Sequence, residues 1–245
     1  MSGNKVSLIG VSNFLGRATA YLLLKGGYTV SITSRDAAKL HRIKDEFHEY
    51  GNVLAVPGEI SNQKSADSLM EEVNAAIEGI DHLVVMVGGF AGDTISDLSA
   101  MDQMLHNHIK IPAMVVKATQ KYLHRGSSVV LITSIGALEH GDPRFFSYSI
   151  GKAGLAKMTE VLSSELIGMG VRVNAVAPNF IDGSFEPGRE WRKSRKLGDL
   201  KTPPEDVALV IKWLISEDSD WVNGALIPVD GGHRLRKQSR NIESA

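Results

Sequence analysis

The chain has 245 residues, of which 43% are hydrophobic, with no cysteine and a formal net charge of −1. A charge so near zero gives no reason to expect a nucleic acid or an anionic membrane as partner, and the lack of cysteine excludes disulfides, thiol catalysis and cysteine-ligated metals. No apolar run approaches the roughly 20 residues of a membrane helix, and residues 1–5 lead into a short strand rather than a signal-peptide core. We expect a soluble, cytoplasmic protein with a sizeable core.

The first predicted unit is a strand, a glycine turn, a helix and a second strand. Residues 6–9 are apolar and predict a buried strand, and residues 10–16 form the turn that follows it. Residues 17–25 carry a helical pattern that Gly26 and Gly27 end, and residues 28–33 predict the second strand. This order is typical of a βαβ unit, whose strands are parallel and whose crossover is right-handed.

The alternation of strand and helix continues along the chain. Further strands are predicted at residues 52–56, 82–87, 128–133, 171–176 and 225–229. Further helices are predicted at residues 36–50, 62–79, 97–124, 148–169 and 204–216. Ser61 or Asn62 is expected to cap one helix, and Pro112 to kink or divide another. Residues 1–232 are therefore predicted to form a single α/β domain, a doubly wound parallel sheet with the Rossmann fold.

Residues 179–204 are the least regular stretch and contain two basic groups, at 189–192 and 193–196. They follow the sixth strand, at the carboxyl edge where ligands bind in such sheets. We expect a mobile substrate lid here, with a solvated surface loop as the alternative. Residues 233–245 are polar and are expected to be a frayed C-terminal tail.

Tyr148 and Lys152 lie four residues apart at the start of a predicted helix, so both are expected on one face, a turn apart. A phenol has an ordinary pKa of about 10, and a nearby cation favours the phenolate and lowers that pKa. The pair therefore suits general acid and base catalysis. Two surface residues at helical spacing are the alternative.

The glycine turn at residues 10–16 follows the first strand and opens a helix. At such a position, backbone N–H groups and the helix dipole hold a pyrophosphate, although a purely structural turn also uses glycine.

The sequence contains 8 histidines, and they are scattered. No pair has metal-binding spacing with a nearby carboxylate on a predicted helix face, so we expect no metal site.

Motifs along nearly the whole chain, from Val6 to about Gly232, resemble the short-chain dehydrogenase/reductase family, in particular its 3-oxoacyl-carrier-protein-reductase-like branch. The matching positions are Gly10 and Gly16 of the glycine turn, Asn107, Ser134, Tyr148 with Lys152, residues 174–178, and the closing segment 223–232.

The chain departs from the family pattern in three places. Phe14 stands at the middle glycine of the turn, and Asn179 replaces a glycine after Pro178. The family's Asn-Asn-Ala-Gly corresponds to residues 85–88, of which only Gly88 is kept.

The resemblance implies hydride transfer between a nicotinamide and a carbonyl or alcohol. Tyr148 would then donate the proton, and Lys152 would stabilise the phenolate and bond the nicotinamide ribose. Ser134 would donate a hydrogen bond to the substrate oxygen. Asn107 would hold a water that links Lys152 to solvent. The alternatives are a strand-end hydroxyl for Ser134 and a locally bonded helix residue for Asn107.

The resemblance also assigns cofactor contacts to the ends of the strands. They are Gly10, Ser12, Asn13, Phe14 and Leu15 in the first turn, Ser34 and Arg35 after the second strand, Glu59 and Ile60 after the third, Gly88 after the fourth, Ile181 after the sixth, and Tyr148 with Lys152. The neighbouring Gly89 would pass close to the ribose as well.

The end of the second strand bears on the choice of coenzyme. A carboxylate there bonds the ribose hydroxyls of NAD and repels a 2′-phosphate. Ser34 stands at that position and Arg35 follows it, with Arg17 as a second positive charge. The sequence therefore predicts NADP(H) over NAD(H).

We expect an oxidoreductase that forms a homotetramer or homodimer, acts on a small carbonyl or alcohol, and binds neither nucleic acid nor membrane. The alternative is a nucleotide-binding sensor or scaffold of the same fold without turnover, which Phe14 and the lost Asn-Asn-Ala-Gly favour. The sequence names neither the substrate nor the physiological direction.

Overall fold

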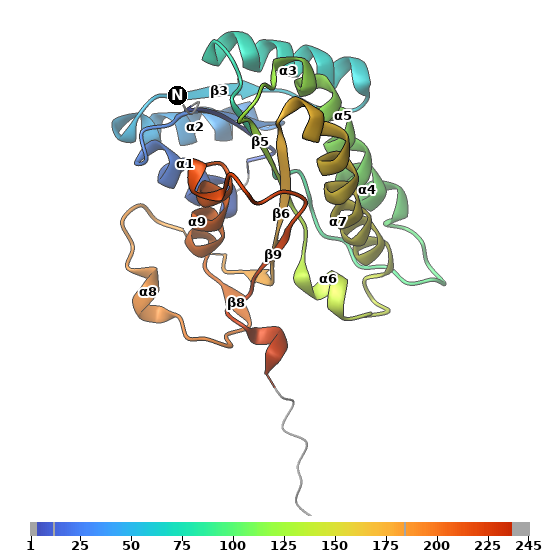
Figure 1. The fold of residues 1–245 in the computed structure, drawn as a ribbon. Coiled ribbons are helices and arrows are strands. Elements are labelled where there is room, and N and C mark those ends of the chain that lie inside the picture. Colours follow the sequence, from blue (N-terminus) through green and yellow to red (C-terminus); the bar gives the residue numbers. More distant parts are fainter. Residues whose placement is uncertain (1–3, 12, 184, 237–245) are drawn as a thin grey trace, which may run out of the picture.

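The computed structural model describes residues 4–11, 13–183 and 185–236, and its centre is a seven-stranded parallel sheet in the order β3-β2-β1-β4-β5-β6-β9 (Figure 1). The strands are β1 Lys5–Ile9, β2 Thr29–Ser34, β3 Val53–Pro57, β4 His82–Val85, β5 Ser128–Ile132, β6 Arg172–Pro178 and β9 Leu226–Val229. The order reverses between β1 and β4, which opens a crevice at the carboxyl ends of these strands. The predicted doubly wound sheet is confirmed.

Helices cover both faces of the sheet (Figure 1). On one face lie α1 Leu15–Leu24, α2 Ala37–Phe47 and α9 Pro204–Leu214. On the other lie α3 Gln63–Ile77, α4 Met101–Leu105, α5 Ile111–Thr119 and α7 Phe146–Leu166. Two short helices, α6 Ile135–Glu139 and α8 Trp191–Ser194, lie outside these layers.

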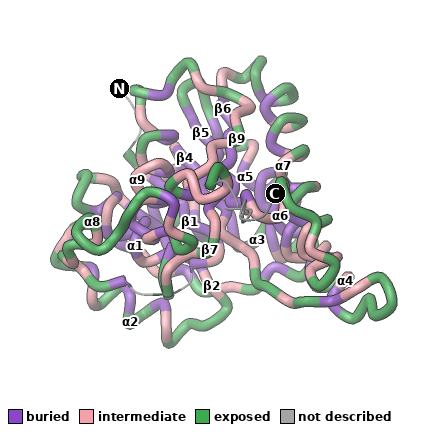
Figure 2. Tube along the Cα trace, turned by 90° about the horizontal axis from the view of Figure 1, so that it is seen from below, coloured by how far each residue is buried: buried purple, intermediate pink, exposed green. Residues whose placement is uncertain are grey.

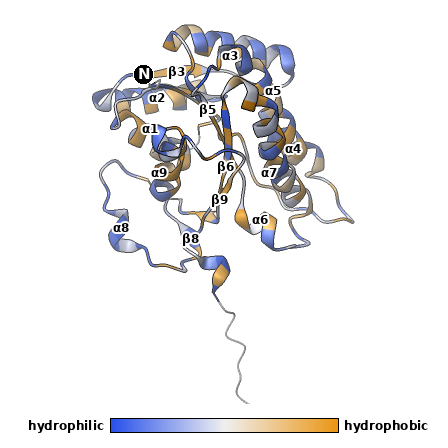
Figure 3. Cartoon of the chain, viewed as in Figure 1, coloured by the Kyte–Doolittle hydropathy of each residue, from blue (hydrophilic) through white to orange (hydrophobic). Residues whose placement is uncertain are grey.

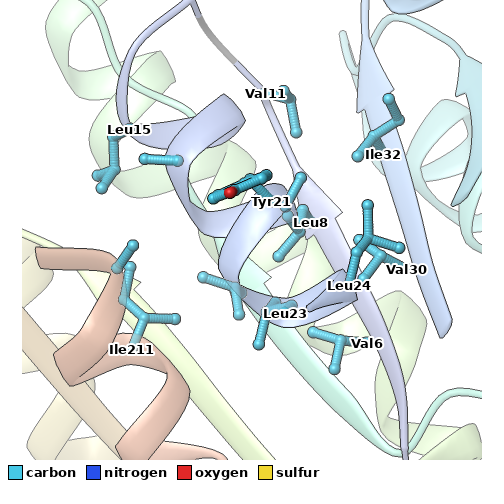
Figure 4. Packing of buried hydrophobic residues seen from close by; sticks show 14 of the residues in the cluster. Val6, Leu8, Val11, Leu15, Tyr21, Leu23, Leu24, Val30, Ile32 and Ile211 are labelled. Atoms are coloured by element: carbon cyan, nitrogen blue, oxygen red, sulfur yellow. The ribbon is translucent and has the colours of Figure 1, made fainter. Parts of the chain in front are cut away.

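Each face of the sheet has its own apolar cluster, because a parallel strand buried on both sides carries apolar residues in succession. Figure 4 shows Leu8 of β1, Leu23 of α1 and Ile211 of α9 in the first cluster. The second contains Leu83 of β4 and Leu155 of α7. The outer side of α3 is largely hydrophilic (Figure 3), so the helix buries one face only.

The predicted helix at residues 97–124 is divided in the structure. It consists of α4, a π-helical turn over His106–Lys110, α5, and a 3₁₀ turn over Gln120–Tyr122. Pro112 lies in the first turn of α5 and has no N–H to donate to a carbonyl one turn earlier, and the chain widens into the π turn just before it. The expected division at Pro112 is confirmed, while residues 97–100 are not helical.

The other predicted helices are found with shifted ends. Asn62 caps α3, as expected, through a reciprocal pair of hydrogen bonds with Ser65. The helix predicted from residue 148 begins earlier, at Phe146. The first helix begins at Leu15 rather than at residue 17. Helix α6 was not predicted, because five residues are too few to show a helical period.

Residues 179–204 contain more regular secondary structure than the sequence predicted. They include a small parallel pair, β7 Phe180–Ile181 with β8 Lys201–Thr202, and helix α8. Figure 2 shows this part of the chain as mostly exposed or intermediate, in contrast to the buried strands.

A 3₁₀ turn over His233–Leu235 begins the predicted tail, whose residues 237–245 lie outside the described part. No helix within the described residues is long and apolar enough to cross a membrane.

Candidate functional site

A cavity with a volume of about 1100 Å³ lies at the carboxyl ends of the strands. Residues from distant parts of the sequence line it, including Gly88 after β4, Ser134 after β5, Ile181 in β7, and Tyr148 with Lys152 on α7. Leu15 of α1 and three residues of the C-terminal turn, His233, Arg234 and Arg236, also reach it. Seven of the predicted site residues therefore face one cavity: Leu15, Gly88, Gly89, Ser134, Tyr148, Lys152 and Ile181.

Tyr148, Ser134 and Lys152 form the polar end of the cavity. The Ser134 side chain lies near the Tyr148 phenol and favours its ionised form. Lys152 is buried, and its Nζ lies 5.9 Å from the centroid of the Tyr148 ring. The same Nζ donates a 2.8 Å hydrogen bond to the carbonyl of Ile132 at the end of β5. One of three ammonium donors is thereby used, and two remain for other partners.

The pKa of Tyr148 differs from the sequence expectation. Burial raises it above its ordinary value, and the nearby Ser134 side chain opposes this only in part. The phenol pKa therefore does not fall below its ordinary value, as its spacing to Lys152 predicted, because burial has the larger effect. Burial also lowers the pKa of Lys152 to about 8, because a charged ammonium is costly away from water.

Helix α7 is held at its N-terminus by Asp93, a buried residue from the loop after β4. The Asp93 carboxylate accepts a 2.9 Å hydrogen bond from the Ser147 N–H and a 2.5 Å bond from its hydroxyl. The Asp93 carbonyl accepts from the N–H of Phe146. These bonds explain why α7 begins before Tyr148 and fix the turn that carries the phenol.

Asn107 lies in the π-helical turn and does not line the cavity. Its side-chain amide donates a 2.9 Å hydrogen bond to the carbonyl of Gly88. The turn is thus joined to the loop after β4, beside the groups that do line the cavity. π turns often occur at functional sites.

His108, the next residue in that turn, is a buried residue that the sequence analysis did not single out. Its ring lies edge to face with the Tyr148 ring, with 5.5 Å between the centroids. Burial and then the charge of Lys152 lower its pKa to about 3, so the imidazole is neutral. The nearby Gly89 backbone opposes this fall in the pKa, but it does not form a hydrogen bond with the imidazole. Neither ring nitrogen of His108 has a hydrogen-bond partner among the described residues.

Two further aromatic side chains, Phe90 and Phe145, line the cavity near the phenol. The Phe90 ring is edge to face with Tyr148 at 5.1 Å and with Phe145 at 4.9 Å. The cavity beside the phenol therefore has apolar walls. Only the tertiary structure brings these residues together, and no motif marked them.

In the predicted glycine turn, the backbone at Gly10 and at Gly16 lies so close to neighbouring residues that a side chain would not fit. Gly10 has a φ of +85°, and a Cβ on it would lie 2.8 Å from the backbone of Val87. A Cβ on Gly16 would lie equally close to Val11, so α1 packs tightly on the turn. Phe14 is the N-cap of α1 with a φ of −111°, which a non-glycine residue adopts readily, and it makes no side-chain capping bond.

The Phe14 ring is 41% exposed and faces Gly183, whose built Cβ would lie 3.5 Å from the ring tip. The ring therefore points out of the turn, toward Gly183. The neighbouring Asn13 is exposed in the turn, and Ser12 lies outside the described residues.

The ends of β2 and β3 hold the other predicted cofactor contacts, outside the lining of the cavity. Arg35 and Glu59 form a long ion pair of 3.7 Å, and their side chains are 81% and 67% exposed. Ser34 accepts a hydrogen bond from the N–H of Asp36. Ile60 is buried in the second apolar cluster.

Arg17 was expected to add a second positive charge here. Its guanidinium instead pairs with Glu46 and lies 5.4 Å from the Phe185 ring centroid, so its charge is already engaged.

The segment 179–204 is attached to the C-terminal turn. The Gly198 carbonyl accepts hydrogen bonds from His233 and Arg236, and the Gly198 N–H donates to the carbonyl of Gly231. These bonds hold one side of the cavity mouth. Nothing in them tests the predicted mobility of this segment. Within the described ranges, no group of three or more histidine, aspartate or glutamate residues could hold a metal ion.

Residues 10–234 match the family model described as enoyl-(acyl carrier protein) reductase. The chain is 31% identical to human dehydrogenase/reductase SDR family member 4 over 250 residues, which cover 94% of this chain and 87% of that protein. It is 30% identical to the 3-oxoacyl-[acyl-carrier-protein] reductase FabG of Thermotoga maritima, with coverage of 93% and 97%. An NADPH-bound short-chain oxidoreductase from Pseudomonas aeruginosa PAO1 superposes with a TM-score of 0.83 at 22% identity, covering 96% of this chain and 98% of that one.

Proposed function

The chain belongs to the short-chain dehydrogenase/reductase family, a family of NAD(P)-dependent enzymes, and we propose that it transfers a hydride between NADP(H) and a carbonyl or secondary alcohol, with Tyr148 as proton donor. The observation that carries this proposal is that Ser134, Tyr148 and Lys152 line the same cavity, with Ser134 close to the phenol. These are the groups that carbonyl reduction requires at the substrate oxygen.

The bound nicotinamide supplies or accepts the hydride, and the side chains manage the proton. During reduction, Tyr148 gives its proton to the carbonyl oxygen as negative charge develops there. The Ser134 hydroxyl stabilises the same oxygen. Lys152, held by the carbonyl of Ile132, places a positive charge near the phenolate that forms. The raised phenol pKa keeps Tyr148 protonated before the reaction, which suits an acid.

The first turn fits a dinucleotide cofactor. Gly10 and Gly16 leave no room for a side chain between the turn, β4 and α1, so backbone can approach a pyrophosphate. The first turn of α1 has neither a side-chain cap from Phe14 nor an acidic residue, so its N–H groups remain for an anion. Gly10, Ser12, Asn13, Phe14 and Leu15 would contact the pyrophosphate side of the cofactor.

The preference for NADP(H) is proposed from the end of β2. Ser34 presents a neutral hydroxyl where a carboxylate would repel a 2′-phosphate. Arg35 is exposed, and its 3.7 Å pairing with Glu59 is long enough to be replaced by a phosphate contact. Glu59 and Ile60 would lie beside the adenine, and Gly88 and Ile181 beside the nicotinamide end.

The substrate is proposed as a small carbonyl or alcohol with an apolar part. Phe90, Phe145 and Ile135 line the cavity, and Phe180 and Leu200 border it on the side of segment 179–204. We propose that this segment acts as a lid, that residues 233–245 are a tail outside the main domain, and that the protein is cytoplasmic.

The proposed homo-oligomer is supported by exposed apolar residues on helix α7 and beside β9. Ile150 and Val161 lie on α7, Leu226 begins β9, and Trp221 before it is 96% exposed. Large apolar side chains in water favour association with a second surface. A homotetramer or a homodimer would cover them.

The test is coenzyme oxidation by the purified chain, using NADPH and NADH with a panel of ketones, aldehydes, sugars and 3-oxoacyl thioesters. Turnover of one class with NADPH supports the proposal. Tight NADPH binding without turnover of any compound of the panel would favour a nucleotide-binding sensor or scaffold. Phe14 and the changed residues 85–87 are the sequence features that support this alternative.

A further inference from the structure

The C-terminal turn brings charged side chains to the cavity that the proton and hydride steps do not use. This turn lies beyond the end of β9, shown in red in Figure 1, and it contributes His233, Arg234 and Arg236 to the lining. Two carboxylates, Glu139 and Asp142, line the cavity as well. Their pairing decides which charge is left for a ligand.

Both lining carboxylates already have a guanidinium partner. Glu139 Oε1 lies 3.1 Å from Arg234 Nε, and Asp142 Oδ2 lies 2.7 Å from Arg144 Nη2. Arg234 is shared with a second carboxylate, that of Asp230, at 2.8 Å. The charge of Arg234 is therefore engaged on two sides.

Arg236 has a different environment. Its Nη1 donates a 3.2 Å hydrogen bond to the carbonyl of Gly198, which is a neutral acceptor. Within residues 4–11, 13–183 and 185–236, no carboxylate forms an ion pair with this guanidinium. A guanidinium has five N–H donors in a planar fork, so most of them remain for a ligand. Arg236 thus brings a positive charge to the cavity lining without a matching negative charge from the chain.

The position of Arg236 is prepared by the fold. A Cβ built on Gly198 would stand 3.0 Å from Arg236 Cδ, so the stem of the arginine lies directly on the glycine backbone. The His233 ring bonds the same Gly198 carbonyl at 2.9 Å, and Arg234 joins the turn to α6 through Glu139. A group that is held before its ligand arrives loses less conformational entropy on binding.

The remaining wall of the cavity suits an apolar chain. Phe90, Phe145, Phe180 and Leu200 line it together with the guanidinium. A carboxylate accepts two parallel bonds from a guanidinium, and the interaction gains strength where apolar walls exclude water. A second negative charge on the ligand would be repelled by Glu139 and Asp142, which favours a carboxylate over a phosphate.

We propose that Arg236 determines the charge of the substrate, which is an oxo acid or the corresponding hydroxy acid with an apolar chain. The carboxylate binds Arg236, while the carbonyl or alcohol carbon lies at Tyr148. Arg236 takes no part in the transfer of the hydride or the proton. This specificity rests on the proposed function, because it names the substrate class of the same site.

The first experiment measures binding without turnover. Octanoate and octanamide have the same chain length and differ in charge, and each is titrated by NMR into the full chain with and without NADPH. Wild type should bind octanoate at least about fivefold more tightly than octanamide. Arg236→Gln should remove this difference at an unchanged melting temperature. Arg192→Gln, which removes an exposed cation of α8 outside the cavity lining, should keep it.

Equal binding of octanoate and octanamide by wild type overturns the proposal, as does a preference that survives in Arg236→Gln. Octyl phosphate is the third probe. Tighter binding of octyl phosphate than of octanoate would overturn the assignment of a carboxylate.

The second experiment measures reduction of oxo acids of increasing length, from 4-oxopentanoate to 7-oxooctanoate, and of their methyl esters. We expect the acid of best length to have a lower KM than its ester. Arg236→Gln should raise the KM of that acid about tenfold and change kcat by less than about twofold, because only binding is lost. The kinetic constants of the ester should stay the same. Arg236→Lys keeps the charge and should restore the KM to within about threefold of wild type.

The two experiments separate this inference from the proposed function. Reduction of the esters with no preference for the acids overturns the role of Arg236 and leaves the hydride transfer standing. If no carbonyl compound is reduced, the proposed function fails, and the comparison of octanoate with octanamide alone decides whether Arg236 binds a carboxylate.

Discussion

The two halves of the carboxyl edge of the sheet are built differently. At the ends of β4, β5 and β6, the functional side chains are buried and connected: Asp93 holds Ser147, Lys152 bonds the Ile132 carbonyl, and Asn107 bonds Gly88. At the ends of β1, β2 and β3, Asn13 and Phe14 are exposed, and Arg35 meets Glu59 only at long range in solvent. One half is fixed by the fold, whereas the other is free to adapt.

This contrast has an energetic consequence. Buried, bonded groups act in a low-dielectric environment and hold their geometry, so removing one changes the chemical step. Exposed charges are screened by water and contribute modestly, so removing one changes affinity for the coenzyme. Substitutions at the β4–β6 end should therefore lower turnover, and substitutions at the β1–β3 end should alter coenzyme binding.

The largest effect is expected for Tyr148→Phe, which removes the phenol hydroxyl and keeps the ring between Phe90 and His108. Turnover should fall at least about a hundredfold, because general acid catalysis is lost. Coenzyme affinity should change little in a fluorescence titration. Tyr122→Phe, a matched change in a half-buried 3₁₀ turn away from the cavity, should have no effect. Near wild-type turnover in Tyr148→Phe would place the proton donor elsewhere.

A smaller loss of turnover is expected for Asp93→Ala. The change leaves the Ser147 N–H and hydroxyl without acceptors at the start of α7, so the turn that carries Tyr148 loosens. We expect turnover to fall about tenfold through misplacement of the phenol, together with a lower melting temperature. Asp102→Ala, an exposed change in α4, is the control. A lower melting temperature with unchanged turnover per folded molecule would show that Asp93 is structural only.

At the other half, Arg35→Ala should weaken NADP(H) binding about tenfold and leave NAD(H) binding nearly unchanged, because a charged hydrogen bond to the 2′-phosphate is lost. Calorimetric titration with both coenzymes measures this, and the difference should shrink at high salt. Arg42→Ala, an exposed change on α2, controls for net charge. Equal binding of the two coenzymes by wild type, or an equal loss for both, would remove the proposed phosphate contact.

The smallest effect is expected for Phe14→Gly. Since Phe14 already has a negative φ and an exposed ring, restoring glycine should change NADPH affinity by no more than about threefold. A gain of more than about tenfold would mean that the ring obstructs the pyrophosphate. In that case, the turn after β1 does not adjust its backbone to the cofactor, although its residues are exposed to solvent.

The sequence by itself determined the layered architecture. The apolar run at residues 82–87 predicts a strand covered on both faces, and β4 lies in the middle of the sheet. The spacing of Tyr148 and Lys152 places both on one side of a helix, and both line the cavity. These features follow from short-range periodicity, which a sequence displays directly.

The tertiary structure alone decided the details that control chemistry. The start of α7 depends on Asp93, 54 residues before Ser147, and the close packing of His108 depends on Gly151 of α7. The direction of the Tyr148 pKa follows from burial rather than from its spacing to Lys152, and Arg17 is engaged by Glu46 on another helix. Each of these results from contacts between residues far apart in the chain. No local pattern encodes such contacts, because burial and hydrogen-bond partners are fixed only when the layers pack together.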